Sequence, residues 1–443
     1  MNDVQSRLAE LLKAGVGDPP ARVTVQAVRR RRARRRGAAA VGAAAAVAVV
    51  AVIGAGLSGR LGSPSPAVSP TVSAAPVPCR TGWHVASGAV PAGDRWDRLV
   101  AVAGSASDDL WAVGDRLPDP RHVFPLLEHW DGRRWAYSAG ASLGGRQAWL
   151  TSVAALSSDD VWAVGYFAPG RRLPEAPLIE HWNGRSWSLQ PTDALTRLRT
   201  ARPQTLTSVA ELAPDDVWVL GTPGSNSSDV YLHWNGASWK LFRGPDIGPH
   251  YGSAAMQVVA TDHRGRLWAA GGWMRGYGEA GVPGGGTVER WNGRRWEVNR
   301  HAAWKEPLTM VAPVAPDDAW AIAGGSFTTA GTYGISPVQV LHWNGRRWKV
   351  EFSPGGASSV DLTGLAAASA DDAYVTGHYA TTRQPFIKNW DGTRWRSLPL
   401  GPAGHLQGLG SIGLTVTSDG SIAALDAEGQ TARANLLWLR CRH

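Results

Sequence analysis

The sequence predicts an all-β fold made of a repeated four-stranded unit, on three observations. From about residue 98 onward, the motif Asp-Asp-x-Trp-x-x-Gly is followed by a variable segment and then by His-Trp-Asn-Gly-x-x-Trp. The motif recurs at intervals of about 50 residues, the period of four-stranded propeller blades. The chain also contains 23 Trp, which suggests that this residue has a repeated structural use.

Two Trp positions mark each repeat. The first occupies the strand after the Asp-Asp pair, at Trp111, Trp162, Trp218, Trp268, Trp320, Tyr374 and Ile422. The second precedes the Asn-Gly or Asp-Gly pair, at Trp130, Trp182, Trp234, Trp291, Trp343 and Trp390, and Trp438 matches this position more loosely, without such a pair. Seven positions of each kind predict a seven-bladed β-propeller.

The second repeat shows how the residues define four strands. The expected strands are 150–156, 161–165, 179–182 and 186–189. Asn183-Gly184 predicts a two-residue type I′ hairpin, because both central positions of that turn need positive φ. Such a turn would place Trp182 and Trp187 diagonally opposite each other on one face of the sheet.

The repeats resemble kelch-type propeller units, in which a strand ending in Gly is followed by an aromatic residue, a tight turn and a Trp. They resemble more closely a Trp-rich "DDVWAVG…HWNG..W" repeat of secreted bacterial proteins. The resemblance covers roughly residues 79–443 and implies the fold, whereas propellers host unrelated functions. The His-Trp-Asn-Gly turn departs from the longer kelch turn, so no kelch partner is carried over.

Ring closure follows from the two ends of the repeat region. The seventh repeat lacks an outer strand, and residues 82–86 match the outer strands of the other repeats. We therefore expect this N-terminal strand to pair with the last blade, which leaves few exposed edges. Cys79 and Cys441 flank the two strands that must pair, so a disulfide is expected in an exported protein. Two free thiols are the alternative.

The N-terminal region predicts a membrane anchor. An Arg-rich cluster closes a basic tail, residues 1–36, and is followed by an uncharged run, residues 37–59, long enough to form one transmembrane helix. A Pro/Ser-rich linker follows at 60–78. The Arg asymmetry predicts a cytoplasmic N-terminus and an extracytoplasmic propeller in a single-pass protein of the cell membrane. A cleaved signal peptide is the competing interpretation.

The charge distribution argues against nucleic-acid binding. The chain has a net charge of +9, and residues 1–36 hold ten basic and three acidic groups, so the repeat region is nearly neutral. Within the tail, residues 4–12 are amphipathic. The alternatives are a helix on the membrane surface and a docking helix for a cytosolic partner.

No catalytic motif is found. The sequence has no metalloprotease, Walker or nucleophile-elbow signature, and no cofactor or metal site is expected. The repeated histidines, His129, His181, His233 and His342, lie one per blade beside a turn. We therefore interpret them as structural and expect no enzyme.

Loop lengths give the functional prediction. The turns after strands one and three are short, whereas the other connections are long and share one face of the ring, where binding residues usually lie. Trp273, Arg275 and Tyr277 in the longest loop, with Arg171 and Tyr251 nearby, are the candidate ligand-binding residues.

The predicted function is an anchored binding, sensing or scaffold module. Its ligand is an unknown protein, peptide or cell-wall glycan. One alternative is a cell-surface glycan lyase or hydrolase, for which two carboxylates within about 10 Å on the loop face would be required. The other is a transmembrane regulator that signals through residues 1–36.

Overall fold

The part of the chain that the computed structural model describes is the repeat region with interruptions. It comprises residues 84–87, 98–119, 122–168, 175–192, 203–223, 229–245, 254–262, 264–275, 282–299, 303–329, 332–354, 360–382, 384–399, 412–417, 421–426 and 436–440. The predictions for residues 1–78 and for the two cysteines concern residues outside these ranges.

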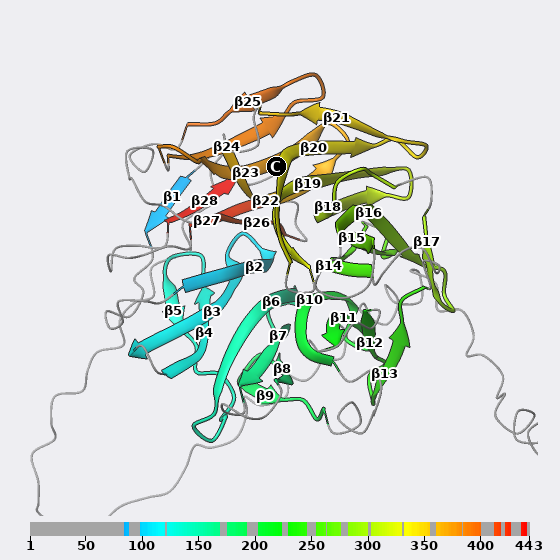
Figure 1. Cartoon of the computed structure of the whole chain (residues 1–443). Coiled ribbons are helices and arrows are strands. Elements are labelled where there is room, and N and C mark those ends of the chain that lie inside the picture. The colour runs from blue at the N-terminus through cyan, green and yellow to red at the C-terminus, as the bar shows by residue number, and fades with distance from the viewer. Residues whose placement is uncertain are drawn as a thin grey trace, which may run out of the picture. The chain divides into compact units, whose positions relative to one another are not determined.

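Four-stranded antiparallel sheets surround a central axis (Figure 1). Blade 1 contains β2 (Arg98–Ala106), β3 (Asp109–Asp119), β4 (His122–Trp130) and β5 (Trp135–Tyr137). Blade 2 contains β6 (Gln147–Ser157), β7 (Asp160–Ala168), β8 (Ala176–Trp182) and β9 (Trp187–Leu189). Blade 3 contains β10 (Pro203–Ala213), β11 (Asp216–Pro223), β12 (Val230–Trp234) and β13 (Trp239–Arg243).

The next three blades follow the same order. Blade 4 contains β14 (Ala254–Thr261), β15 (Leu267–Arg275), β16 (Val282–Trp291) and β17 (Trp296–Val298). Blade 5 contains β18 (Leu308–Ala315), β19 (Asp318–Thr329), β20 (Thr332–Trp343) and β21 (Trp348–Phe352). Blade 6 contains β22 (Val360–Ser369), β23 (Asp372–Tyr379), β24 (Pro385–Trp390) and β25 (Trp395–Ser397).

The remaining sheet is built differently. Three strands come from the C-terminal end, β26 (Ile412–Val416), β27 (Ile422–Asp426) and β28 (Leu436–Arg440), and the fourth is β1 (His84–Ser87). β1 pairs antiparallel with β28, with His84 opposite Leu439. This composite sheet joins the two ends of the repeat region.

The predicted fold class, a seven-bladed β-propeller preceded by one transmembrane helix, is corrected by the structure. Six blades are continuous in the chain and carry the complete repeat, whereas the composite sheet has Ile422 at the first Trp position and a separate N-terminal strand. Among the described residues, no helix is long and apolar enough to cross a membrane. The segment 37–59 is outside the described residues.

The core is a series of interfaces between neighbouring blades. Trp162 of blade 2 is 1% exposed and shares a cluster with Val217 and Trp239 of blade 3. Equivalent clusters join each of the other consecutive pairs from blade 1 to blade 6. Ala423 of the composite sheet packs against blade 1, and Ile422 packs against blade 6. The first Trp thus packs between sheets, as expected.

The Asn-Gly turn differs from the predicted two-residue hairpin. Trp182 and Trp187 pair directly across β8 and β9, so four residues form the loop. Asn183 Oδ1 accepts the backbone N–H groups of Arg185 and Ser186 at 3.0 and 3.1 Å, while Gly184 has φ +87°. The Asn side chain caps the loop, and this lengthens the turn and makes the two Trp directly opposed.

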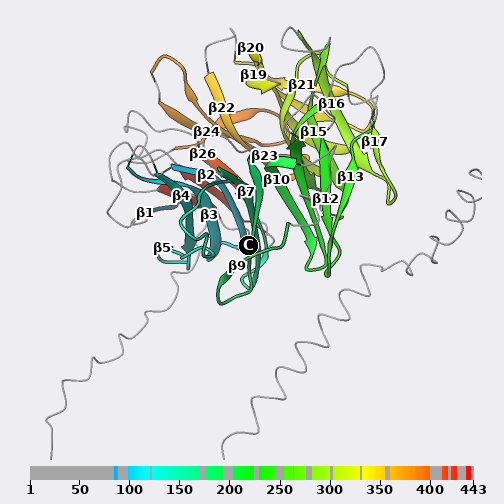
Figure 2. The ribbon, with the colours of Figure 1, turned by 60° about the horizontal axis from the view of Figure 1, so that its bottom comes forward.

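Several predicted loops are extensions of the strands. The β19–β20 hairpin continues to Thr329 and Thr332, and it bends at Gly324 and Gly325, whose φ values are +77° and +85°. In Figure 2 the β15–β16 and β19–β20 hairpins rise on one side of the ring, and the β12–β13 turn lies on the opposite side. The ring of blades therefore has two distinct rims.

Candidate functional site

We define the short-turn rim as the side that carries the turns between strands one and two and between strands three and four of each blade. The loop rim is the opposite side. Both turns of a blade touch on the short-turn rim. A Cβ built on Gly184 would lie 2.8 Å from Cβ of Asp159, and the same contact recurs in blades 1, 3 and 5. This contact explains why the Asp-Asp and Asn-Gly pairs recur together.

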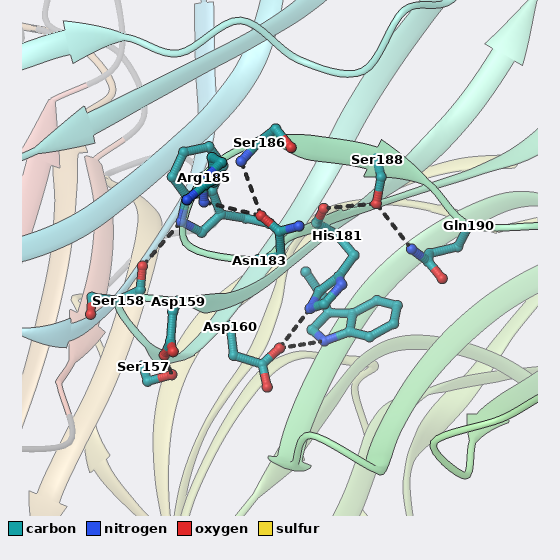
Figure 3. Close-up of polar contacts among 12 residues, drawn as sticks. Ser157, Ser158, Asp159, Asp160, His181, Asn183, Arg185, Ser186, Ser188 and Gln190 are labelled. Atoms are coloured by element: carbon teal, nitrogen blue, oxygen red, sulfur yellow. Dashed lines mark hydrogen bonds and ion pairs between the residues drawn. The ribbon is translucent and has the colours of Figure 1, made fainter. Parts of the chain in front are cut away.

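In blades 1, 2, 3 and 5 the repeated His contacts an Asp and stacks on the first Trp of its own blade, and Figure 3 shows His181 and Asp160 of blade 2. In blade 2, His181 Nε2 lies 2.8 Å from Asp160 Oδ1, which also accepts Nε1–H of Trp162 at 3.2 Å. The His181 ring stacks on Trp162 with centroids 4.3 Å apart. The other ring contacts of Trp162 are with Trp234 and Trp239 of the next blade.

Blades 1, 3 and 5 repeat the His–Asp contact and the His–Trp stacking. Their His–Asp distances are 2.7, 3.0 and 2.8 Å. The Trp N–H donates to the Asp in blade 3, from Trp218 to Asp216 at 2.9 Å, whereas Trp111 Nε1 and Trp320 Nε1 have no partner among the described residues. Each His has an Asp and a Trp of its own blade as partners, so the structural interpretation of the histidines is consistent with their contacts. Within the described ranges, no cluster of three or more His, Cys, Asp or Glu side chains suits a metal ion.

Blades 4 and 6 replace parts of the group. In blade 4, Arg266 stands at the Asp position and Arg290 at the His position, and the Arg290 guanidinium lies 3.8 Å from the Trp268 ring centroid. In blade 6, Asn389 Nδ2 donates to Asp372 Oδ1 at 3.0 Å. Both blades therefore keep a contact from the side chain at the His position, while the charge of that side chain changes.

Buried carboxyl groups lie between blades, away from both rims. Glu180 accepts the backbone N–H of Ala141 at 2.9 Å, and burial raises its pKa to about 7. Glu289, at the equivalent position of blade 4, accepts the Tyr231 hydroxyl at 2.7 Å, and burial likewise raises its pKa to about 7. Both residues are 0% exposed, so we assign them to the frame and not to a reacting site.

Glu211 is a further buried acid, on β10 beside Asp160. Burial, together with the charge of the nearby Asp160, raises the pKa of Glu211 to about 10. The neutral, protonated form of Glu211 is therefore favoured in the folded protein.

The loop rim differs from blade to blade at one register position. The Gly that ends the second strand lets the first strand approach, since a Cβ on Gly165 would lie 1.9 Å from the Trp149 carbonyl oxygen. The next residue then pairs across to the first strand. These pairs are Arg98–Asp115, Trp149–Tyr166, Thr205–Thr222, Ala255–Gly272 and Asp361–His378 in blades 1, 2, 3, 4 and 6.

Blades 1 and 2 bring two of these pairs together into a patch, defined as Arg98, Asp115, Trp149, Tyr166 and Glu175. Arg98 Nη2 donates to Asp115 Oδ2 at 2.5 Å, with the Arg98 side chain 58% exposed and Asp115 3%. Trp149 stacks on Tyr166, with centroids 5.2 Å apart and planes at 13°.

The charges of this patch surround the Tyr166 phenol. Burial raises the pKa of Tyr166, the charges of Glu175 and Asp115 raise it further, and Arg98 lowers it. Burial also raises the pKa of Asp115, while its hydrogen bond to Arg98 opposes that effect. The patch thus combines an aromatic surface with charges of both signs.

The predicted binding residues have different outcomes. Trp273 lies in β15 on the loop rim, opposite Ala254 and Gly285, and it is half-buried. Arg275 ends the same strand, so it belongs to the β15–β16 hairpin and not to a loop. Tyr277, Arg171 and Tyr251 lie outside the described residues. Their joint role remains a prediction.

Sequence reasoning missed Arg98, Asp115, Tyr166 and Glu175 as site residues. Tyr166 and Asp115 directly follow the Gly of the repeat motif. The strand was expected to end at that Gly, and the residue after it was given no role, yet the pair that this residue forms differs from blade to blade. A comparison of the residues after each motif Gly is the signal that could have found them.

Comparison with known proteins shows similarity at the level of the fold. No family model matches the chain, and no curated protein matches it in sequence. The structure described as YCF48 bound to D1 peptide is 15% identical, with a TM-score of 0.50, over 82% of this chain and 96% of that chain.

Two further structures are less similar. The β-propeller domain of Myceliophteria thermophila Cps50 (Swd1) has a TM-score of 0.47 at 10% identity, over 80% of this chain and 98% of that chain. The polysaccharide lyase Uly1 has a TM-score of 0.48 at 10% identity, over 80% and 90%. At these identities likeness concerns the fold alone: the chain is a β-propeller.

Proposed function

We propose that this propeller is a binding module that recognises a protein or peptide segment on its loop rim, at the patch of blades 1 and 2. The observation that carries the proposal is the contrast at one register position. Five blades place five different residue pairs there, although the strands and Trp contacts around them repeat. Variation on a constant frame is typical of a recognition surface.

The chemistry of the patch suits a polypeptide. Trp, Tyr and Arg are enriched in the energetically important parts of protein interfaces. The stacked Trp149 and Tyr166 offer an apolar surface, while Arg98 and Glu175 offer a cation and an anion beside it. A segment with one apolar side chain flanked by charges would satisfy all three. A structural neighbour of this fold is described as bound to a peptide.

The experiment is a peptide-display selection on the purified full chain. Peptides selected on the wild type should bind Trp149→Ala and Arg98→Gln about tenfold or more weakly, as expected for loss of interface anchors. Arg346→Gln on the short-turn rim is the matched control and should bind normally. Equal loss in the control, or no loss in the patch variants, would show that the loop rim is not the recognition surface.

The glycan-acting alternative has less support. Of the two carboxyl groups in the patch, Asp115 is nearly buried and hydrogen bonded to Arg98. That pairing favours a positioning role over proton transfer to a substrate. The patch therefore offers no second accessible carboxylate to act together with Glu175.

Location and the seam disulfide also belong to the proposal. We expect an extracytoplasmic propeller attached through the N-terminal region, and protease added to intact cells should then remove it. Protection would exclude that location. The pairing of β1 with β28 supports a bond between Cys79 and Cys441, because the first stands shortly before β1 in the sequence and the second directly after β28. Peptide mapping without reductant should recover the linked pair, and two alkylated thiols would exclude it.

A further inference from the structure

The short-turn end of blade 4 differs from every other repeat blade in charge. It carries Arg264, Arg266, Arg290, Arg294 and Arg295, against the acids Asp262 and Glu297. The other blades have an Asp-Asp pair where blade 4 has Gly265-Arg266. The substitution removes two carboxylates and adds a guanidinium in one place.

The same substitution leaves a gap. In blades 1, 2, 3 and 5 the first Asp of the pair lies against the turn glycine, with 2.8 Å between its Cβ and a built glycine Cβ. In blade 4 that Asp is Gly265, and no described atom lies within 4 Å of a Cβ built on Gly293. Among the described atoms, a Cβ built on Gly265 would meet only Leu212 Cδ2, at 3.7 Å. A notch thus stands where other blades hold an aspartate.

The arginines beside this notch are exposed and only partly engaged. Arg295 Nε donates to Glu297 at 3.0 Å, and Arg266 Nε lies 4.0 Å from the buried Asp262 carboxylate. Arg264 and Arg294 make no side-chain hydrogen bond or ion pair to any residue in the described ranges. Guanidinium groups have a planar fork that matches the oxygens of phosphate.

We propose that the notch between Gly265 and Gly293, flanked by Arg264, Arg266, Arg294 and Arg295, binds a phosphate group. The phosphate takes the place that a carboxylate side chain fills in the neighbouring blades. Backbone donors contribute little, because the N–H groups of Arg264 and Arg266 bond to Asp262 and those of Arg294 and Arg295 bond to Asn292. Recognition therefore rests on the guanidinium groups.

Two sources of phosphate are compatible with this site. A soluble phosphate is one, and a phospholipid headgroup is the other. β1 begins at the short-turn rim, since His84 pairs with Leu439 one residue before β28 ends. β1 therefore begins on the rim that carries the notch, and the basic, apolar residues 1–59 precede it in the sequence, so a lipid probe is included.

The test uses the full chain and its thermal unfolding midpoint with inorganic phosphate, dioctanoyl-phosphatidylglycerol or dioctanoyl-phosphatidylcholine. A ligand that binds only the folded state raises the midpoint. The double variant R294Q/R295Q should weaken binding about tenfold or more, in line with loss of charge-assisted hydrogen bonds. The matched control is R346Q/R347Q, because blade 5 has the same Asn-Gly-Arg-Arg turn but keeps Asp317 against Gly345.

Stabilisation of the wild type and the control, but not of R294Q/R295Q, supports the site. Stabilisation by inorganic phosphate assigns a soluble source, and stabilisation by the phosphatidylglycerol lipid alone assigns a headgroup. Equal weakening in both double variants would show general charge attraction and overturn the proposal. Absence of stabilisation by either anionic probe, or equal stabilisation of the wild type and R294Q/R295Q by the lipids, would also overturn it.

Discussion

The two rims of the ring differ in how strictly they repeat. On the short-turn rim the same Asp, Gly and Asn contacts recur in blades 1, 2, 3 and 5, and the His–Asp distances stay between 2.7 and 3.0 Å. On the loop rim, one register position carries an ion pair, an aromatic stack or two hydroxyl groups, according to the blade. Repetition therefore identifies the frame, and its failure identifies the candidate sites.

The comparison teaches the same lesson within the short-turn rim. Blade 4 alone among the six repeat blades lacks the Asp-Asp pair, and it is there that exposed arginines gather. A uniform repeat has no reason to lose a favourable contact unless another contact replaces it. Both proposed sites are therefore departures from the repeat: one on the loop rim and one on the opposite side.

The strongest test of the division between frame and loop rim is the replacement of Trp162. This residue is 1% exposed and contacts rings of two blades. Trp162→Ala should lower the free energy of unfolding by about 3–5 kcal/mol, the usual cost of a buried Trp. Trp149→Ala, at the half-buried loop-rim position, should cost clearly less in the same denaturant titration. Equal costs would mean that the loop rim is part of the frame.

A second test concerns the acids inside the frame. The folded pKa of Glu180, about 7, exceeds its ordinary value of 4.5. The neutral form is thus favoured by the fold, and its stabilisation is present below about pH 4.5 and is lost as the pH rises through about 7.

Glu180→Gln should remove this dependence, because the amide oxygen still accepts the Ala141 N–H. At pH 8 the variant should be more stable than the wild type by on the order of 3 kcal/mol, with little difference at pH 4. Denaturant titrations at both pH values measure the effect. Glu297→Gln, at an exposed position, is the control and should leave the pH dependence unchanged. If the stability of Glu180→Gln changed with pH as that of the wild type does, Glu180 would not be the source of the pH dependence.

Much of the frame follows from sequence. The spacing of Trp111, Trp162 and their equivalents predicts the repeat blades, because a buried Trp is needed once at each blade interface. The match of residues 82–86 to the outer strands predicts the pairing of β1 with β28. Turn chemistry alone did not fix the loop length: the Asn183 side chain caps two backbone N–H groups, which converts the expected two-residue turn into four residues.

The candidate sites were less predictable. The expected strands of the second repeat, 150–156 and 161–165, stop short of Trp149 and Tyr166, and the register between the strands is needed to join these two residues. The connection that begins at Trp273 was expected to be a loop, although Trp273, Met274 and Arg275 pair with Gly285, Pro283 and Val282 as extensions of the strands. The blade-4 departure was visible as Arg264-Gly265-Arg266, yet its meaning depends on Gly293, which only the fold brings alongside.

The smallest expected effect isolates the Asp–Gly contact that separates blade 2 from blade 4. Gly184 and Gly293 have φ values of +87° and +95°, so Ala at either position should cost about 1–2 kcal/mol from the backbone alone. In blade 2 the new Cβ would also lie 2.8 Å from Cβ of Asp159, which adds on the order of 1 kcal/mol of overpacking. Gly184→Ala should therefore be more destabilising than Gly293→Ala in denaturant titrations. The double variant Asp159→Gly/Gly184→Ala removes the clash, so Gly184→Ala should cost less in the Asp159→Gly background than in the wild type. If the two single variants cost the same, contact between the two turns does not explain why Asp-Asp and Asn-Gly recur together, and the notch in blade 4 loses its structural basis.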